Sequence, residues 1–389
     1  MKTQLKPLVL ALSFATLMAC NANTKSNSSK LLIAETVIET NSKDKKPEIK
    51  VALLLDTSNS MDGLIDQAKA QLWKIVNELS YAKCEEQNPN LKIALYEYGN
   101  DNLNAEEGYL RQVIAFSDDL DEISKSLFSL TTNGGNEYCG KVIKTALSQL
   151  DWGESKDDLK LIFIAGNETY TQGNVSYKDA SKLAHQNDVT VNTIFCGDYN
   201  QGISILWKDG ADLTHGNYMA INLNEATVHV ASPYDDKILE LNEKLNKTYV
   251  AYGSAGRKKM EMQAEQDSNA MSYNKANAVS RTVSKSSRLY KNNSWDLVDA
   301  EKEDDFSYEN LKVEELPKEL KGKSNAEIKT YVEKKAKTRE KLQNEIATLN
   351  LKRRNYVAKQ QINDTTNSLE NAMIKALKSQ AEKKNYKWE

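Results

Sequence analysis

The stretch Ile49–Met61, with the sequence IKVALLLDTSNSM, constrains the fold of this chain more than any other. Its apolar run, Val51–Leu55, stops at a polar loop, Asp56–Ser60. A short apolar run bounded by charged and turn residues is typical of a strand buried in a parallel sheet. The residues after the loop place apolar side chains at helical spacing, namely Leu64, Ile65, Ala68, Leu72, Ile75, Val76 and Leu79. We therefore predict a buried strand, a polar loop and a helix in succession.

The polar loop carries three oxygen donors at alternate positions, Asp56, Ser58 and Ser60. Ligands of open α/β sheets bind at the carboxyl ends of the strands, where these donors can point to one spot. A small divalent cation such as Mg²⁺ prefers oxygen ligands. Alternatively, Asp56 or Ser60 only caps the following helix. A cap needs one such residue and the spacing supplies three, so we favour a cation site.

Strands and helices alternate along the following residues. Further strands are expected at Leu91–Tyr98, Tyr109–Phe116, Leu159–Ala165, Val189–Phe195 and Tyr218–Leu223, with helical patterns between most of them. The strand Tyr109–Phe116 is expected to be antiparallel, at an edge. The alternation predicts the α/β class, with a doubly wound and mainly parallel sheet.

The motif Asp56-x-Ser58-x-Ser60 after an apolar strand resembles the metal-ion-dependent adhesion site of von Willebrand factor type A (VWA) domains. The resemblance extends over about Glu48–Val230. It implies a VWA-like, Rossmann-like domain, which we place at residues 48–232. It also implies a bound Mg²⁺, or Ca²⁺ or Mn²⁺, and a protein partner that offers an Asp or Glu carboxylate to the cation.

Two later loops depart from the family pattern. The family contributes a threonine from a Gly-Gly-Thr loop, whereas this chain has Asn136 after two glycines. The family strand that corresponds to Leu159–Ala165 ends in Asp-Gly, and here the carboxylate is missing. Asn167 and Glu168 follow directly, and either substitute for it or form a solvated turn. The resemblance therefore implies an incomplete metal site formed by Asp56, Ser58, Ser60, Asn136 and Glu168.

Residues 1–20 are expected to be a lipoprotein signal peptide. Two lysines precede the apolar stretch Pro7–Met18, and the sequence LMAC ending at Cys20 resembles a bacterial lipoprotein processing site. Acyl chains on Cys20 would form a membrane anchor, because each buried CH₂ contributes about 0.8 kcal/mol. The alternatives are an ordinary signal peptide with an incidental cysteine, or a spanning helix, for which the run is too short. Residues 21–47 are predicted to be a flexible tether.

The other cysteines are Cys84, Cys139 and Cys196. Disulfides are consistent with an exported protein. Cys139 and Cys196 are both expected near the carboxyl edge of the sheet, so a disulfide between them is one hypothesis. Three buried thiols are the other, since strand and helix positions cannot establish the short Cα separation that a bridge requires.

Residues 233–389 are predicted to form a charged helical region. A long helix is expected at Ser324–Lys359 and a second at Leu369–Lys383, with a turn between them that predicts an antiparallel helical hairpin. Apolar residues of the long helix lie near a heptad spacing, which is consistent with a coiled-coil surface for a partner. We favour the alternative that this region supports the first domain by packing on it.

Charge and composition narrow the function. The formal net charge of −3 gives no electrostatic reason to expect nucleic-acid binding. The three histidines lie in separate segments, and no phosphate-binding loop is evident, so a metal-dependent hydrolase is disfavoured. The layout resembles bacterial envelope lipoproteins with one VWA domain. It implies a non-enzymatic, cation-assisted binding or adhesion lipoprotein that faces the periplasm or the exterior. The alternative is an envelope scaffold that acts through its helical tail, with a vestigial metal site.

Overall fold

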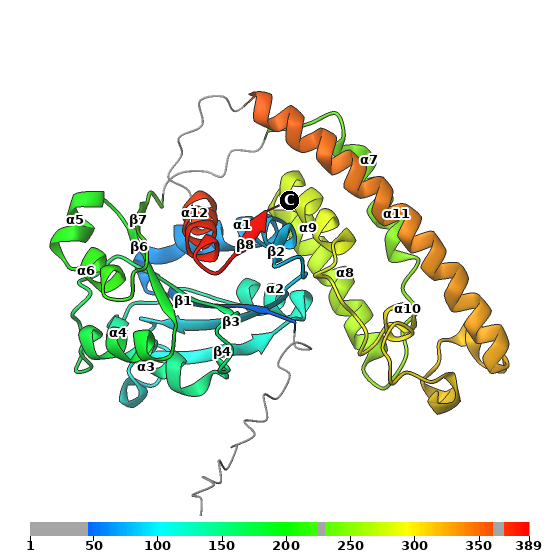
Figure 1. Ribbon diagram of the computed structural model, residues 1–389, viewed down its shortest axis with the longest axis horizontal. Helices are drawn as coiled ribbons and strands as arrows, with labels where there is room; N and C mark the ends of the chain where they lie inside the picture. Colours follow the sequence, from blue (N-terminus) through cyan, green and yellow to red (C-terminus); the bar gives the residue numbers. More distant parts are fainter. Residues whose placement is uncertain (1–45, 224–229, 361–368, 389) are drawn as a thin grey trace, which may run out of the picture. The chain divides into compact units, whose positions relative to one another are not determined.

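The protein is built on a six-stranded sheet with the strand order β4-β3-β1-β5-β6-β7 (Figure 1). The strands are β1 (Glu48–Asp56), β3 (Asn90–Tyr98), β4 (Leu110–Ser117), β5 (Leu159–Gly166), β6 (Thr190–Cys196) and β7 (Tyr218–Ile221). Within this sheet the β3–β4 pair is antiparallel, and the other four neighbouring pairs are parallel. The computed structural model describes residues 46–223, 230–360 and 369–388. The predicted mainly parallel sheet and its antiparallel edge strand are confirmed.

Helices cover both faces of the sheet. On one face lie α1 (Asp62–Ser80) and α2 (Leu120–Phe128), and on the other lie α3 (Cys139–Gln149), α4 (Tyr177–Gln186) and α6 (Trp207–Asp212). Alternate residues of β1 enter the two cores, because side chains along a strand point to opposite faces. Leu53 and Leu55 pack with α1, whereas Ala52 and Leu54 pack with α3. Burial on both faces explains why the strand sequence is continuously apolar.

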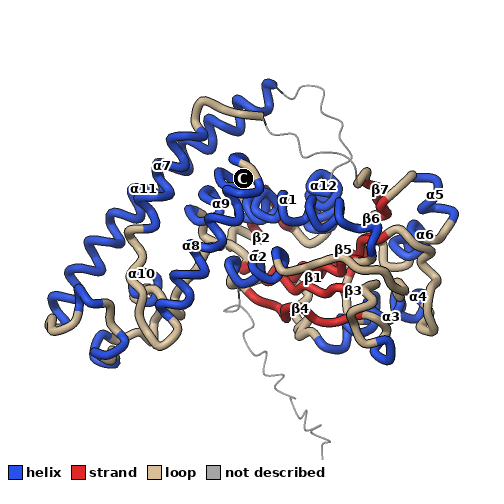
Figure 2. Tube along the Cα trace, turned by 180° about the vertical axis from the view of Figure 1, so that it is seen from behind, coloured by secondary structure: helices blue, strands red, loops and turns tan. Residues whose placement is uncertain are grey.

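A helical region follows the sheet and packs against α1. It comprises α7 (Asp235–Asn246), α8 (Gly256–Tyr273), α9 (Lys275–Ser286), α10 (Leu297–Ala300) and α11 (Asn325–Gln360). Helix α9 packs on α1, and α11 packs on α7 and α9 (Figure 2). Residues Lys45–Glu389 form one compact unit. The remaining short elements are α5 (Tyr199–Ser204), β2 (Ala82–Cys84) and the 3₁₀ turns η2 (Asn59–Met61), η3 (Ala105–Glu107), η4 (Tyr308–Asn310), η5 (Val313–Glu315) and η6 (Lys318–Leu320).

A buried ion cluster joins α9 to the sheet domain. The Arg281 guanidinium pairs with Asp121 of α2 at 2.8 Å and with Asp267 of α8, and its side chain is 1% exposed. Its guanidinium carbon also lies 4.7 Å from the ring centre of Trp73 in α1. Lys285 forms a second buried pair with Asp267 at 2.8 Å. Because buried charges are tolerated only when paired, this cluster fixes how α8 and α9 dock.

The last helix, α12 (Leu369–Glu382), does not form the predicted hairpin with α11. It packs on α1 and on β5, β6 and β7 (Figures 1 and 2). Its apolar residues Met373, Ala376 and Leu377 belong to the same core as β1 and α1. Strand β8 (Tyr386–Trp388) then pairs with β2. The hairpin prediction is wrong because the apolar face of α12 covers the open part of the sheet instead of α11.

Four of the near-heptad apolar residues of α11 are buried within the chain, and Leu349 and Tyr356 are half-buried. Ile328, Val332, Leu342 and Ile346 are at most 8% exposed. They contact the neighbouring helices, which agrees with the supporting role that we favoured over a coiled-coil surface. No helix in the described part of the chain has the length and the hydropathy that crossing a bilayer requires. Cys20 and the tether up to residue 45 lie outside the described residues.

Candidate metal-binding site

The loop after β1 brings the three predicted oxygen donors together. The Asp56 carboxylate is buried, and its Oδ1 accepts a hydrogen bond from the Ser58 backbone N–H at 2.7 Å. The hydroxyl oxygens of Ser58 and Ser60 lie 3.4 Å apart. Ser58 precedes the 3₁₀ turn η2, which leads directly into α1. Neither η2 nor α1 has a side-chain cap hydrogen bond, so the alternative that these residues only cap a helix is not supported.

The loop before α3 holds a buried carboxylate, that of Glu137, which the sequence did not predict. The side chain of Asn136 is exposed, and so is that of Glu168. Glu137 is instead buried, with 3% of its surface exposed, and its carboxyl interacts directly with Asp56 and Ser58. The Glu168 backbone N–H donates to Glu137 Oε2 at 3.3 Å. The structure therefore brings Glu137 to Asp56 and leaves Asn136 one position away, pointing outward.

Two glycines let this loop approach the end of β3. Gly99 has φ = +78°, and a Cβ there would lie 2.6 Å from Asp56 Oδ1 and 2.9 Å from Glu137 Cγ. Gly135 has φ = +156°, and a Cβ there would lie 2.4 Å from the Gly99 carbonyl oxygen. A side chain at Gly135 would push the two backbones apart, and one at Gly99 would displace the side chains of Asp56 and Glu137. The close approach of these backbones thus delivers Glu137 to Asp56.

The two carboxyl groups perturb each other. Burial raises the pKa of Asp56 well above its ordinary value, and the neighbouring Glu137 raises it further. Burial also raises the pKa of Glu137. Within the described part of the chain, Asp56 Oδ2 is buried without a hydrogen-bond partner. Two carboxylates in contact in a low-dielectric site cannot both ionise unless a cation compensates them, so the pair fits either a shared proton or a bound divalent cation.

The side of the site formed by β5 holds an amide instead of a carboxylate. Gly166 leaves space there, since a Cβ on it would lie 3.1 Å from Asp56 Oδ2 and from Trp207 Cη2. The Asn167 amide nitrogen donates to Ser60 Oγ at 3.0 Å, while Asn167 Oδ1 is buried and has no hydrogen-bond partner in residues 46–223, 230–360 and 369–388. Because the orientation of an amide is assigned from its hydrogen bonds, a flipped Asn167 would offer an oxygen at Ser60. Asn167 therefore has a better position for a ligand than Glu168.

The disulfide hypothesis is wrong. Cys139 and Cys196 are free, as is Cys84, and all three are buried. Cys139 packs in the core on the α3 side of the sheet, whereas Cys196 packs in the core on the α1 side. The two thiols point to opposite faces because the side chain of Cys196 follows the alternation of β6. The alternative of three buried thiols is the correct one.

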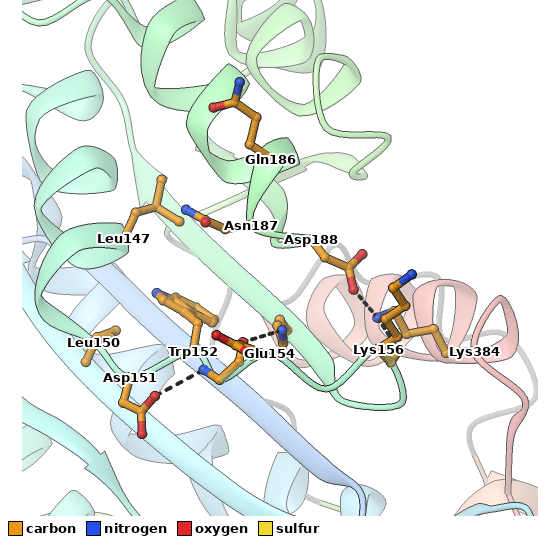
Figure 3. A pocket seen from close by; sticks show the side chains of 12 residues that line it. Leu147, Leu150, Asp151, Trp152, Glu154, Lys156, Gln186, Asn187, Asp188 and Lys384 are labelled. Atoms are coloured by element: carbon orange, nitrogen blue, oxygen red, sulfur yellow. Dashed lines mark hydrogen bonds and ion pairs between the residues drawn. The ribbon is translucent and has the colours of Figure 1, made fainter. Parts of the chain in front are cut away.

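A groove lies at the opposite edge of the sheet and is unrelated to the Asp56 loop (Figure 3). Its volume is about 830 Å³, and Trp152, Lys160 and Lys384 are among the residues that line it. Lys384 pairs there with Asp188 at 2.7 Å, and the Lys160 ammonium donates to the Gly153 carbonyl oxygen at 2.7 Å.

The histidines are closer together than their separation in sequence suggested. The rings of His185 and His215 pack edge to face, with centroids 5.7 Å apart. His229 lies outside the described residues. Within residues 46–223, 230–360 and 369–388, no group of three or more His, Cys, Asp or Glu side chains is arranged to hold a metal ion. A cation at Asp56 would therefore depend on hydroxyl oxygens beside the carboxylates.

Comparisons with solved structures return several proteins of low sequence identity. The conserved hypothetical protein BatB from Bacteroides thetaiotaomicron is 16% identical, with a TM-score of 0.35, and the match covers 45% of this chain and 90% of that one. The SpRpn10 VWA domain is 14% identical, with a TM-score of 0.34 and coverage of 46% and 90%. The pilus adhesin SpaC from Lactobacillus rhamnosus GG, in its open conformation, is 11% identical, with a TM-score of 0.33 and coverage of 46% and 28%.

The comparison with curated proteins gave no match. The sequence profile of the von Willebrand factor type A domain matches residues 50–210. This range contains all but the first two residues of β1, the Asp56–Ser60 loop, Glu137 and the strands through β6. Residues 50–210 of this chain are a von Willebrand factor type A domain.

Proposed function

We propose that this protein is a non-enzymatic binding protein whose VWA domain holds a divalent cation. Asp56, Ser58, Ser60 and Glu137 would provide the ligands, and Mg²⁺ is the first candidate because all of these donors are oxygens. Ca²⁺ and Mn²⁺ are the alternatives. The cation would keep a vacant position, which an Asp or Glu carboxylate of a partner protein would fill.

One observation carries this proposal. Two buried carboxyls meet at the carboxyl edge of the sheet, and one of their oxygens, Asp56 Oδ2, has no hydrogen-bond partner among the residues that the structure describes. Leaving a buried polar atom unpaired costs about 1–3 kcal/mol, so such an atom needs an explanation. A cation would occupy this position, pair with both carboxylates and satisfy the unpaired oxygen.

A binding role is supported by what surrounds the site. The thiol of Cys139 and the hydroxyl of Tyr98 lie near the Asp56 edge, but both are fully buried, and burial raises the pKa of each well above its ordinary value. Groups in this state are poor nucleophiles and poor general bases. The histidines that the structure describes belong to α4 and to the turn before β7, at the other edge of the sheet. The arrangement therefore favours recognition over hydrolysis.

The location in our proposal is the bacterial cell envelope. The LMAC sequence that ends at Cys20 supports lipidation of this cysteine, which would hold the protein on a membrane with its VWA domain facing the periplasm or the exterior. Mass spectrometry of the chain from a bacterial membrane fraction would test this step. We expect a diacylated or triacylated N-terminal Cys20, and a soluble product from a Cys20→Ser variant.

The cation is tested by titrating the full chain with Mg²⁺, Ca²⁺ and Mn²⁺ in a calorimeter and by measuring its melting temperature. We expect saturable binding and an increase in melting temperature, both lost in Asp56→Asn. Equal behaviour of the two proteins would instead support a scaffold that acts through its helical region, with a vestigial metal site.

A further inference from the structure

Exposed apolar side chains gather on the segment that follows β6. In the described residues, eight large hydrophobic side chains are exposed, and Tyr199 (50%), Ile203 (38%) and Leu206 (36%) are three of them. We call these three residues the α5 corner. Single exposed hydrophobic residues are normal on a protein surface, but three within two turns of chain indicate a contact surface.

The α5 corner lies on the same edge of the sheet as Asp56. Helix α5 begins three residues after Cys196, the last residue of β6, and β6 is separated from β1 only by β5. Adjacent strands lie about 4.8 Å apart, so the start of α5 is displaced laterally by roughly 10 Å from Asp56. Figure 1 shows α5 beside β6 and β7.

Two contacts fix the corner relative to the candidate metal site. The Ile205 carbonyl oxygen accepts a hydrogen bond from Tyr170 N–H at 3.1 Å, and the Trp207 indole N–H donates to the Glu168 carbonyl oxygen at 2.7 Å. The loop from Glu168 to Tyr170 is the same loop whose backbone contacts Glu137. The corner is therefore attached to the loop that contacts Glu137.

The backbone at Leu206 is unusual for its residue type. Leu206 has φ = +76°, in the left-handed region that leucine rarely adopts. The neighbouring residues Ile205 and Trp207 pack into the core, so Leu206 alone turns outward. A leucine that keeps 36% of its surface exposed in this strained conformation stabilises the fold less than a buried one, which favours a role in contact.

We propose that the α5 corner binds an apolar side chain of the same partner segment whose carboxylate ligates the cation. This inference rests on the proposed cation-dependent function and specifies its ligand. Three residues of extended chain span roughly 10 Å, which matches the lateral displacement between Asp56 and the start of α5. The partner segment would therefore carry an Asp or Glu and a large apolar residue about three positions away. The occupant is an extended segment of another protein with this pair of side chains.

The chain offers a matched control for the corner. Leu213 is 40% exposed and follows α6, so it resembles Leu206 in type and exposure. It lies at the other edge of the sheet, because the next residue, Thr214, accepts the hydrogen bond of Val191 N–H near the start of β6. A substitution at Leu213 therefore changes the polarity of the surface as much as the same substitution at Leu206 does, but it does not alter the edge that holds Asp56.

The probes are short Gly/Ser peptides with one central Glu, with or without a Leu three positions away on either side. Their binding to the full chain is measured by fluorescence anisotropy in Mg²⁺ and in EDTA. We expect the Leu-containing peptides to bind the wild type and Leu213→Asn about fivefold or more tightly than the Gly/Ser peptide. This preference should disappear in Leu206→Asn and in Ile203→Ser. Asparagine tolerates the left-handed region, so Leu206→Asn should keep the melting temperature of the wild type.

The outcomes separate this inference from the function on which it rests. If all Glu peptides bind in a Mg²⁺-dependent way with no preference for Leu, the proposed role of the α5 corner is wrong and the proposed cation site is still supported. The proposed role of the α5 corner is also wrong if Leu206→Asn and Ile203→Ser keep the preference for Leu-containing peptides. No Mg²⁺-dependent binding of any Glu peptide would overturn both proposals.

Discussion

The carboxyl groups of Asp56 and Glu137 meet in the interior of the VWA domain, and burial raises the pKa of both. One lies at the end of β1 and the other in the loop before α3. With no cation between them, the pair is stable only while it holds a proton. The protonation of this pair is therefore linked to the stability of the fold, and binding of the proposed cation would be linked to both.

The first prediction concerns pH in the absence of divalent cations. The pKa of Asp56 is raised in the folded chain by burial and by Glu137, so the native state binds more protons than the unfolded chain above pH ~4. The free energy of unfolding should therefore fall as pH rises, by up to about 1.4 kcal/mol per pH unit for one proton. Urea denaturation in EDTA at several pH values would show this loss in the wild type and a weaker loss in Asp56→Asn. Parallel pH profiles of the two proteins would contradict the linkage.

The second prediction separates Glu137 from its neighbour. Replacing Glu137 with Gln removes one of the two charges that would hold the cation, and we expect Mg²⁺ affinity to fall about tenfold or more, which is about 1.4 kcal/mol or more. Asn136→Ala should leave the affinity within twofold, because the Asn136 side chain is exposed. Calorimetric titration measures both. If Asn136→Ala has the larger effect, Asn136 is the ligand after all.

The third prediction tests the close approach at Gly99. An alanine there would strain the backbone and place its Cβ against Asp56 and Glu137. Gly253 also has a positive φ, +76°, but a Cβ on it would have no atom within 4 Å. Gly253→Ala should lower the free energy of unfolding only through the strain of the left-handed backbone, by about 1–2 kcal/mol. Gly99→Ala should lower the free energy of unfolding by more than this and should also abolish Mg²⁺ binding, whereas Gly253→Ala should retain Mg²⁺ binding.

The fourth prediction concerns how the helical region is attached. Arg281→Met would leave the buried Asp121 carboxylate without its cation and Asp267 with Lys285 alone, and should destabilise the chain by about 3–5 kcal/mol. Lys259 of α8 pairs with Asp119 at 2.7 Å, but both side chains are partly exposed. Lys259→Met should therefore cost at most about 1 kcal/mol. Chemical denaturation would measure the difference, and equal effects would mean that the cluster does not hold α9 in place.

The fifth prediction distinguishes packing inside the chain from a coiled coil with a partner. Ile346 of α11 is fully buried, whereas Leu351 of the same helix is 60% exposed. Ile346→Ala should destabilise the isolated protein by about 2–5 kcal/mol, and Leu351→Ala should stay within about 0.5 kcal/mol of the wild type. If neither variant changes the free energy of unfolding, the apolar face of α11 does not pack in the isolated chain.

The sequence predicted the sheet well because the signals of its strands are local. Each buried strand is a short apolar run with a polar end, and the run Val51–Leu55 already identifies β1 as central. The position of α12 could not be predicted in this way. An amphipathic helix shows in its sequence that one face is apolar, but it does not show which surface that face will cover.

In the candidate site, too, the residues of one short loop could be predicted, whereas a residue from a distant loop could not. Asp56, Ser58 and Ser60 belong to one short loop, so their spacing alone suggested that they converge. Glu137 depends on the path of a distant loop past Gly99, and a shift of one residue decides whether Asn136 or Glu137 points inward. The Cys139–Cys196 hypothesis failed because it considered where strand β6 ends and not which face its last side chain occupies.

With the proposed anchor at Cys20 and the proposed partner at the Asp56 loop, strand β1 would run between the two points at which the protein is pulled. Its first residue, Glu48, follows the segment that leads to Cys20, and its last, Asp56, lies at the proposed partner site. All nine residues of β1 are in register with β3, and seven of them with β5. Tension between an anchor and a captured partner would load both ladders lengthwise. Their hydrogen bonds would then have to shear together instead of opening one after another, so the geometry that positions Asp56 would also resist mechanical force.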